Sequence, residues 1–165
     1  MLKQSVTYRL ASVAEDAIRP AEGLFRARFG LDVHELRVLR LIDDEPGITF
    51  SALAARTKFE RSATSRILSR LVRSGLARRR IDPADARSYR FAATARARAV
   101  RARADPLSLE LEAVLLSPLS AEERRRFLAT LEKLAAWVGG GYLPAMAVAQ
   151  PDARPAPARR RGGRR

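Results

Sequence analysis

The spacing of apolar residues predicts a mostly helical chain. Between residues 6 and 29 apolar side chains recur at helical spacing, which predicts a first helix, in one piece or in two because Pro20 lies inside it. Gly30 is expected to end this helix. Asp32 followed three residues later by Glu35 resembles a capping box, which predicts the start of a second helix there.

Two shorter helices are expected next. Thr49 can cap a helix that runs to about Arg56, and after a brief turn another helix spans about residues 60–74. On a helical wheel this second helix divides into an apolar arc, which includes Thr64 as a packing residue, and a polar arc. The polar arc contains only hydroxyls and guanidiniums: Ser62, Ser65, Arg66, Ser69, Arg70 and Arg73.

A hairpin and two further helices complete the predicted elements. Residues 76–81 and 88–92 have the pattern of short strands around a turn-rich tip at residues 82–87. Thr94 can cap a long Ala/Arg helix, which we expect to kink or break at Pro106.

A last helix begins at a second capping box, and order is expected to end soon after it. Ser120 and Glu123 form this box, and Gly139 to Gly141 terminate the helix. Apolar periodicity then disappears, which predicts a disordered Arg/Pro-rich tail over residues 144–165.

Composition excludes several classes of protein. The 165 residues, 47% of them apolar, are enough for a buried core. There is no cysteine and one histidine, His34, so a thiolate nucleophile, a Cys- or His-based metal site and a Ser-His-Asp triad lack their residues. We therefore expect no enzyme and no cofactor. Apolar runs are too short to cross a bilayer and the N-terminus has no signal-peptide core, which predicts a soluble cytoplasmic protein without a membrane partner.

The formal net charge of +14 is unevenly distributed. Residues 56–103 carry 15 basic and 3 acidic side chains, and residues 151–165 carry six arginines and one aspartate. Residues 1–55 and 104–150 are close to neutral, at −1 and −2. A GC-rich genome would enrich arginine everywhere, so codon bias does not explain the neutral flanks. A basic segment between neutral ones indicates a polyanionic partner.

The order of elements describes a winged helix-turn-helix, and specific motifs carry a family resemblance. Residues 63–79 (ATSRILSRLVRSGLARR), the D-P-x-D-x-R sequence at 82–87 and Thr94 are similar to the multiple-antibiotic-resistance regulator (MarR) family. The resemblance covers about residues 5–140. Two departures are Ala93 and Ala97, which replace the family's Leu and Gly beside Thr94, and Pro106 inside the long helix.

The resemblance implies a mainly α fold with a small β-hairpin wing. Its winged helix-turn-helix core, residues 31–94, would lie between an N-terminal dimerisation helix (1–30) and C-terminal dimerisation helices (95–143). The implied function is that of a homodimeric, sequence-specific transcription regulator, usually a repressor, bound to a palindromic operator in double-stranded DNA. The recognition helix, about residues 60–74, would enter the major groove and the wing, residues 79–91, the minor groove.

The same resemblance assigns roles to individual residues. Ser62, Ser65 and Arg66 would face base edges, whereas Arg70 and Arg73 would serve phosphates. On the wing, the expected DNA-binding residues are Arg80, Asp85, Arg87 and Arg90. Arg87 would enter the minor groove, and Asp85 would either orient it or merely shape the turn.

The sequence leaves two questions open, the role of His34 and the specificity of nucleic-acid binding. His34 either lines the family's effector pocket or is an ordinary solvent-facing or hydrogen-bonded histidine; without cysteine, a small-molecule effector or none remains. The alternative function is a nonspecific or architectural nucleic-acid-binding protein that uses the basic segment and the Arg-rich tail.

Overall fold

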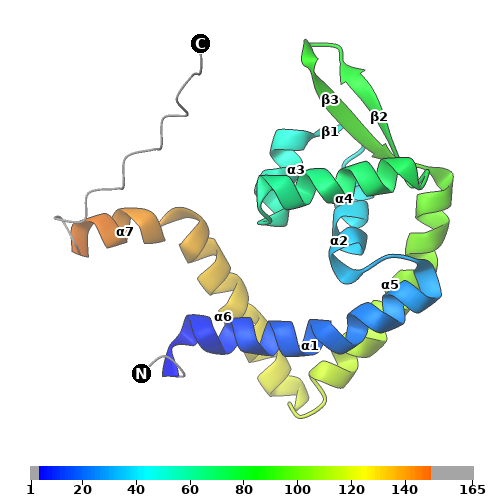
Figure 1. Ribbon diagram of the computed structural model, residues 1–165. Helices are drawn as coiled ribbons and strands as arrows, with labels where there is room; N and C mark the ends of the chain where they lie inside the picture. Colours follow the sequence, from blue (N-terminus) through cyan, green and yellow to red (C-terminus); the bar gives the residue numbers. More distant parts are fainter. Residues whose placement is uncertain (1–3, 150–165) are drawn as a thin grey trace. The chain divides into compact units, whose positions relative to one another are not determined.

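The computed structural model describes residues 4–149 and divides the chain into two compact units, Met1–Leu115 and Leu116–Arg165 (Figure 1). The first unit contains five helices and a three-stranded sheet among its described residues: α1 (Val6–Phe29), α2 (Val33–Asp44), β1 (Ile48–Thr49), α3 (Phe50–Thr57), α4 (Arg61–Arg73), β2 (Ala77–Asp82), β3 (Asp85–Ala93) and α5 (Ala95–Leu115). The second contains α6 (Ala121–Gly140) and α7 (Tyr142–Ala149). The predicted fold class, mainly helical with a small β-hairpin, is confirmed.

The core of the first unit lies where α2 packs against α3, α4 and the sheet. Its fully buried side chains include Leu39 and Ile42 of α2, Leu53 of α3 and Leu71 of α4. Thr64 is buried with them, as predicted, and its hydroxyl donates to the carbonyl of residue 60 at 3.2 Å, so this hydroxyl is not left unpaired in the core.

The local signals at helix ends are confirmed. The Asp32 carboxylate accepts from the backbone N–H of Glu35 at 2.8 Å, and the Glu35 carboxylate accepts from that of Asp32 at 2.9 Å. Ser120 and Glu123 form the same reciprocal pair before α6. Gly30 has a φ of 69°, the left-handed conformation that ends α1 without the Cβ clash of other residues.

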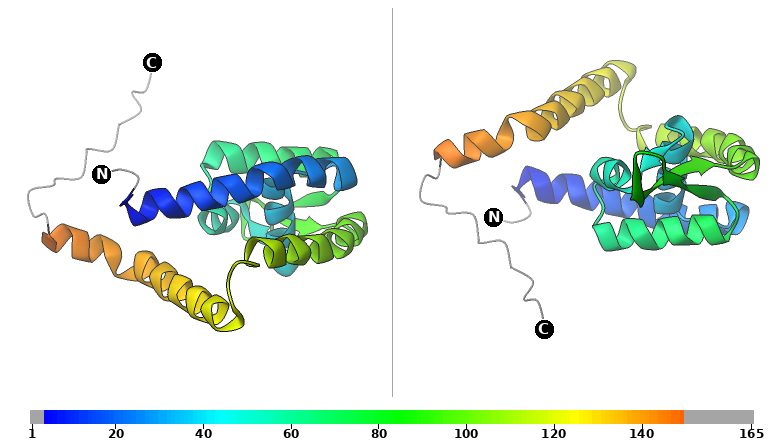
Figure 2. Two further views of the ribbon diagram at one scale, coloured as in Figure 1. Left: turned by 90° about the horizontal axis from the view of Figure 1, so that it is seen from below. Right: turned by 90° about the horizontal axis from the view of Figure 1, so that it is seen from above.

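Both helices that contain an internal proline are continuous. α1 passes through Pro20, and α5 passes through Pro106 without the break that the sequence left open. Packing on both sides of Pro106 opposes a break, because Ala104 and Leu107 are buried in the core. The C-terminal half of α1 lies beside α5 (Figure 2).

The hairpin has a longer second strand and a tighter turn than predicted. β3 begins at Asp85, and the two residues between the strands are Pro83 and Ala84. The Asp82 carboxylate accepts from the N–H of Ala84 at 3.0 Å, which holds the turn closed. The sheet is antiparallel in the order β1-β3-β2. β1 was not predicted, because two residues are too few to show strand alternation.

A shared carboxylate fastens α5 to α2. Asp105 accepts from Arg40 Nε at 2.8 Å and from Arg101 Nε at 3.1 Å, and Arg101 also pairs with Asp43 of α2 at 3.0 Å. Partial burial raises the pKa of Asp105, but the hydrogen bonds from the two guanidiniums outweigh this effect and leave the pKa below its usual value.

The second unit leaves an apolar stripe of α6 exposed, in particular Phe127, Leu131, Leu134 and Trp137. α7 corrects the prediction of disorder from residue 144, since residues 144–149 are helical. Pro144 is compatible with this helix because the first turn needs no N–H at that position. The rest of the predicted tail, residues 150–165, lies outside the described residues. No described helix is both long enough and apolar enough to cross a membrane.

We predict that Asp105→Asn lowers the free energy of unfolding at neutral pH by about 1 kcal/mol, because both guanidiniums lose a charged acceptor. The folded-state pKa of Asp105 lies below the unfolded value, so its contribution is complete above pH ~4 and disappears as the pH falls through the folded pKa. Urea denaturation of both proteins at neutral and acid pH measures the difference. Glu110→Gln, at an exposed position of the same helix, is the control. A difference that stays constant at low pH would contradict the assignment.

Candidate nucleic-acid interface

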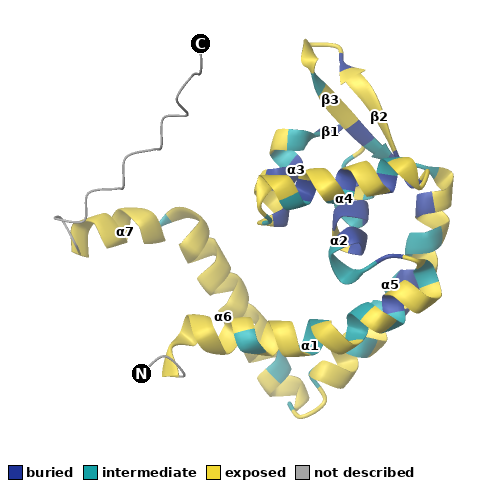
Figure 3. Ribbon diagram, viewed as in Figure 1, coloured by how far each residue is buried: buried dark blue, intermediate teal, exposed yellow. Residues whose placement is uncertain are grey.

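The outer arc of α4 carries the polar side chains that the helical wheel predicted. Ser62, Ser65 and Arg66 are exposed, while Leu68 and Leu71 on the opposite side are buried (Figure 3). The helix begins with Arg61, whose guanidinium lies 4.9 Å from the centre of the Phe50 ring of α3. This contact, which sequence reasoning missed, fixes the start of α4 against α3.

A cavity of about 460 Å³ separates α4 from the hairpin. Ser65, Ser69 and Arg73 line it from α4, and Arg79 and Tyr89 line it from β2 and β3. The Arg79 guanidinium lies 4.9 Å from the centre of the Tyr89 ring, so the ring holds the cation in place. The remaining lining residues are apolar: Phe50, Leu68, Val72 and Phe91. The cavity therefore combines an apolar floor with guanidiniums and hydroxyls.

Sequence reasoning chose Arg80 on β2 and overlooked Arg79. The sheet register aligns Arg80 with Arg90 and Arg79 with Phe91, so the two neighbouring arginines point to opposite faces. Arg78, Arg80 and Arg90 line a second cavity of about 440 Å³, on the face that Arg79 does not share. The hairpin is thus basic on both faces.

One carboxylate of the hairpin holds a guanidinium in place, and it is Asp82. Its buried side chain pairs with Arg90 Nε at 3.0 Å, across the two strands. The N–H of Ala84 and then the hydrogen bond from Arg90 lower the pKa of Asp82, so this carboxylate is ionised at neutral pH. Arg80, aligned with Arg90, has no ionic partner among the described residues.

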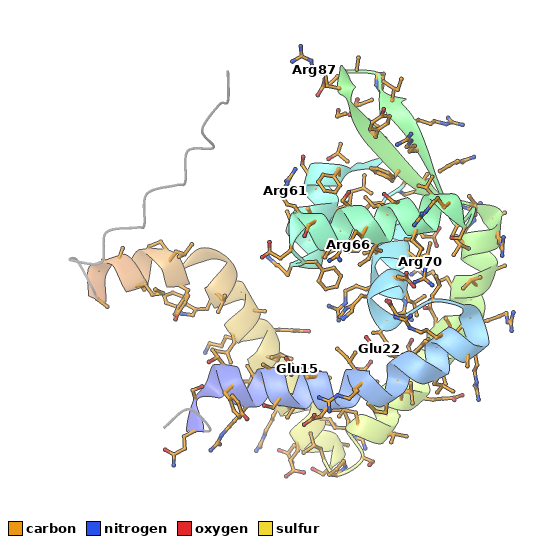
Figure 4. The ribbon with its side chains drawn as sticks, viewed as in Figure 1. Glu15, Glu22, Arg61, Arg66, Arg70 and Arg87 are labelled. Atoms are coloured by element: carbon orange, nitrogen blue, oxygen red, sulfur yellow. The ribbon has the colours of Figure 1, made fainter. Side chains whose placement is uncertain are left out.

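The tip presents Arg87 to solvent. The Asp85 carboxylate accepts from the backbone N–H of Arg87 at 2.9 Å, and the Ser88 hydroxyl donates to the Asp85 carbonyl at 3.2 Å. These contacts shape the turn, which is the simpler of the two roles considered for Asp85. The Arg87 side chain extends away from the hairpin (Figure 4).

Arg70 differs from the other arginines of α4. Its Nη1 pairs at 3.0 Å with the buried carboxylate of Glu35, on α2. The structure thus brings together Ser65, Arg73 and the wing, but it turns Arg70 toward the start of α2.

The remaining basic side chains form a surface with no internal counter-charge. Seven guanidiniums on α4 and the hairpin have no carboxylate partner within residues 4–149: Arg61 and Arg79, which lie over aromatic rings, and Arg66, Arg73, Arg78, Arg80 and Arg87. Like charges that gather without compensation within a fold create a positive potential that attracts a polyanion. In the same part of the chain, no group of three or more His, Asp or Glu side chains could hold a metal ion.

His34 lies at a groove of about 390 Å³. Glu15, Ile18 and Glu22 of α1 line the same groove, together with Ala14 and Arg19. The His34 ring meets the Phe59 ring edge-on at 4.9 Å, and its Nδ1 is buried without a hydrogen-bond partner among the described residues. His34 is half-buried, and its role as an effector-pocket residue or as a solvent-facing or hydrogen-bonded histidine stays a prediction.

Known proteins resemble this chain in both sequence and fold. A family model described as the MarR family matches residues 29–88. The HTH-type transcriptional repressor Rv2887 of Mycobacterium tuberculosis is 30% identical over 127 residues, which cover 77% of this chain and 88% of the relative.

Solved structures with a similar fold include a MarR-family protein and a protein–DNA complex. The M. tuberculosis MarR-family protein Rv2887 in complex with p-aminosalicylic acid has a TM-score of 0.66 at 27% identity, over 79% of this chain and 98% of the other. The Staphylococcus aureus MepR–DNA complex has a TM-score of 0.71 at 21% identity, over 80% and 97% of the two chains, and supports the fold alone.

The relatives are transcription regulators and not enzymes, in agreement with the expectation from composition. The match to Rv2887 spans most of both chains, and the family model covers the segment from the end of α1 to the wing. This protein therefore belongs to the MarR family of DNA-binding transcriptional regulators.

Proposed function

We propose that this protein is a homodimeric, sequence-specific repressor that binds a palindromic operator, with α4 in the major groove and the β2–β3 wing in the minor groove. The observation that carries the proposal is the surface of uncompensated guanidiniums, from Arg66 on α4 to Arg87 at the wing tip. Its length along two adjacent elements fits a duplex, which offers two grooves side by side.

The outer arc of α4 has the chemistry for direct readout of bases. The major groove is wide enough for one helix, and each base pair presents there its own pattern of donors and acceptors. Arg66 can donate two hydrogen bonds to a guanine, while the hydroxyls of Ser62 and Ser65 can donate or accept.

The cavity between α4 and the wing suits the sugar-phosphate strand that separates the two grooves. Arg73 and Arg79 approach it from opposite walls, and the hydroxyls of Ser65 and Ser69 add neutral donors. Contacts of this kind position the protein on the duplex without reading sequence.

The wing carries charge for both sides of a minor groove. Arg87 at its tip can enter the groove, where the negative potential is greatest when the groove is narrow. Arg78 and Arg80, on the face that Arg79 does not share, are free to meet the second phosphate strand. Arg90 lines the same cavity, but its guanidinium is paired with Asp82.

Two apolar stripes support a homodimer. Val6, Leu10 and Val13 recur at helical spacing in the N-terminal half of α1 and are exposed. On α6, Phe127 and Leu131 belong to a second exposed stripe. Monomeric proteins rarely leave such stripes uncovered. A two-fold dimer would cover them and place two copies of α4 on half-sites about one helical turn apart.

We propose repression because the relative Rv2887 is named a transcriptional repressor. The alternative, a nonspecific or architectural protein, would bind all duplexes alike through its arginines. The hydroxyl-rich arc of α4 favours sequence readout, because Ser62 and Ser65 add no charge and would contribute little to nonspecific affinity.

The groove at His34 is our candidate effector site. The relative Rv2887 has been solved with p-aminosalicylic acid, an aromatic carboxylate. Here Glu15 and Glu22 line the groove beside His34, and carboxylates at a binding site repel an anion. We therefore propose an effector with a positively charged group that reaches these two glutamates.

We predict different effects for two arginines of α4. Arg66→Ala lowers the preference for a selected operator over its scrambled sequence by about 1–3 kcal/mol, because a base contact is lost. Arg73→Ala weakens both duplexes alike and reduces the slope of log K against log salt by about 0.9, because a phosphate contact is lost. Fluorescence anisotropy titrations measure both quantities, with Arg125→Ala on α6 as control. Equal behaviour of the two variants would refute this division, and equal wild-type affinity for both duplexes would refute sequence-specific binding.

The charge of the effector can be tested with two probes of nearly the same size and opposite charge. Benzamidine is expected to bind the protein and to release the operator, whereas benzoate is expected to do neither. Glu15→Gln and Glu22→Gln each weaken benzamidine binding about fivefold, the effect of ~1 kcal/mol for unit charges about 4 Å apart in water. Isothermal titration calorimetry gives the affinities, with Glu112→Gln as control. Tighter binding of benzoate would contradict the proposal.

A further inference from the structure

The carboxylate of Glu35 is buried and has both oxygens engaged. Its side chain is 3% exposed, Oε2 accepts from the backbone N–H of Asp32 at 2.9 Å, and Oε1 pairs with Arg70 Nη1 at 3.0 Å. The first bond caps α2 and involves the neutral backbone. Arg70 is thus the cation that compensates the charge of Glu35, and it comes from another helix.

Arg70 also reaches the junction between α1 and α2. Its Nη2 donates to the carbonyl of Gly30 at 3.4 Å, at the residue that ends α1. Arg26 of α1 pairs with Asp32 at 3.1 Å, so the same junction is fastened to α1 as well. One guanidinium therefore joins the last turn of α4 to the place where α1 and α2 meet.

The energetics make this pair hard to break. Removal of the partner of a buried ion leaves an uncompensated charge, which costs several kcal/mol. The exchange of Glu35 for a phosphate as the partner of Arg70 would carry that cost. Because Arg70 is half exposed, its guanidinium would otherwise be free to turn toward solvent and DNA.

The position of Arg70 on α4 gives the pair its functional meaning. Arg66 and Arg70 are four residues apart and leave the same side of the helix, as Figure 4 shows. When Arg70 is fixed to α2, the rotation of α4 about its own axis is fixed too. That rotation decides whether Arg66 and Ser62 face the bases.

We infer that Glu35 is a positioning residue for operator recognition: it withholds Arg70 from the phosphate backbone and sets the rotation of α4 for base readout. The inference rests on the DNA binding through α4 proposed above. It replaces the phosphate role that sequence comparison gave to Arg70. The protein thereby gives up one nonspecific contact and gains a fixed orientation of its reading surface.

Glu35→Gln tests this inference directly. The amide oxygen of Gln can still cap α2, but the charge that holds Arg70 is gone. Arg70 then becomes available to phosphates, so affinity for scrambled DNA rises about threefold at low salt and the salt slope steepens by about 0.9. The ratio of selected-operator to scrambled affinity falls. A merely structural defect would lower affinity and would not steepen the slope.

Two further variants identify the origin of the effect. In Glu35→Gln with Arg70→Gln, the gain in nonspecific affinity disappears, because it requires the guanidinium. Arg70→Gln alone leaves the salt slope of the wild type unchanged. This single variant also decides the matter if Glu35→Gln fails to fold, since a slope reduced by about 0.9 would mean that Arg70 contacts phosphate.

The measurements are anisotropy titrations of the full chain with selected and scrambled duplexes over a series of salt concentrations. Circular dichroism verifies folding, and Glu110→Gln is the matched control. An unchanged slope in Glu35→Gln, or a gain that persists in the double variant, overturns the inference. A wild type that binds both duplexes equally would instead refute the proposed function, so the two failures are distinguishable.

Discussion

The exposed polar arc of α4 depends on the burial of its opposite arc. Leu68 and Leu71 are 3% and 0% exposed, and Thr64 is fully enclosed. Burial of each leucine contributes about 1.5–3 kcal/mol, which holds α4 in the core. Apart from Arg70, the side chains of the polar arc are therefore not needed to pack α4 against the rest of the fold. A helix with this division can present serines and arginines to a ligand without loss of its own stability.

Buried carboxylates then decide which arginines are available. Glu35 engages Arg70, and Asp82 engages Arg90, each through a side chain that the fold encloses. The cost of an unpaired buried charge keeps these guanidiniums in place. Arg66 and Arg87 have no such partner among the described residues and remain available. The basic segment is thus divided into arginines that hold the fold together and arginines that can meet a polyanion.

Local signals in the sequence predicted the helix ends well, because the partners of a cap lie three residues apart. The capping box at Asp32 and the burial of Thr64 follow from spacing alone. Partners across the fold could not be predicted in this way. Asp85 lies two residues before Arg87 in the D-P-x-D-x-R motif, yet the acid that holds a guanidinium is Asp82, which pairs with Arg90 of the neighbouring strand.

The remaining differences have the same cause. The strand pattern at residues 76–81 predicted a strand, but only the register shows that Arg79 and not Arg80 shares a cavity with α4. The pair of Arg70 with Glu35 joins residues 35 positions apart, and no local pattern encodes it. Helix α7 was missed because its residues are apolar all round, so they show no periodicity.

Selection of binding sites from random duplex DNA tests the central claim, that α4 reads sequence from a two-fold dimer, most directly. We expect an enriched inverted repeat whose half-sites lie about one helical turn apart, with the strongest preference at positions in the major groove. A pool that shows no enriched sequence, or only an unrepeated one, would contradict it.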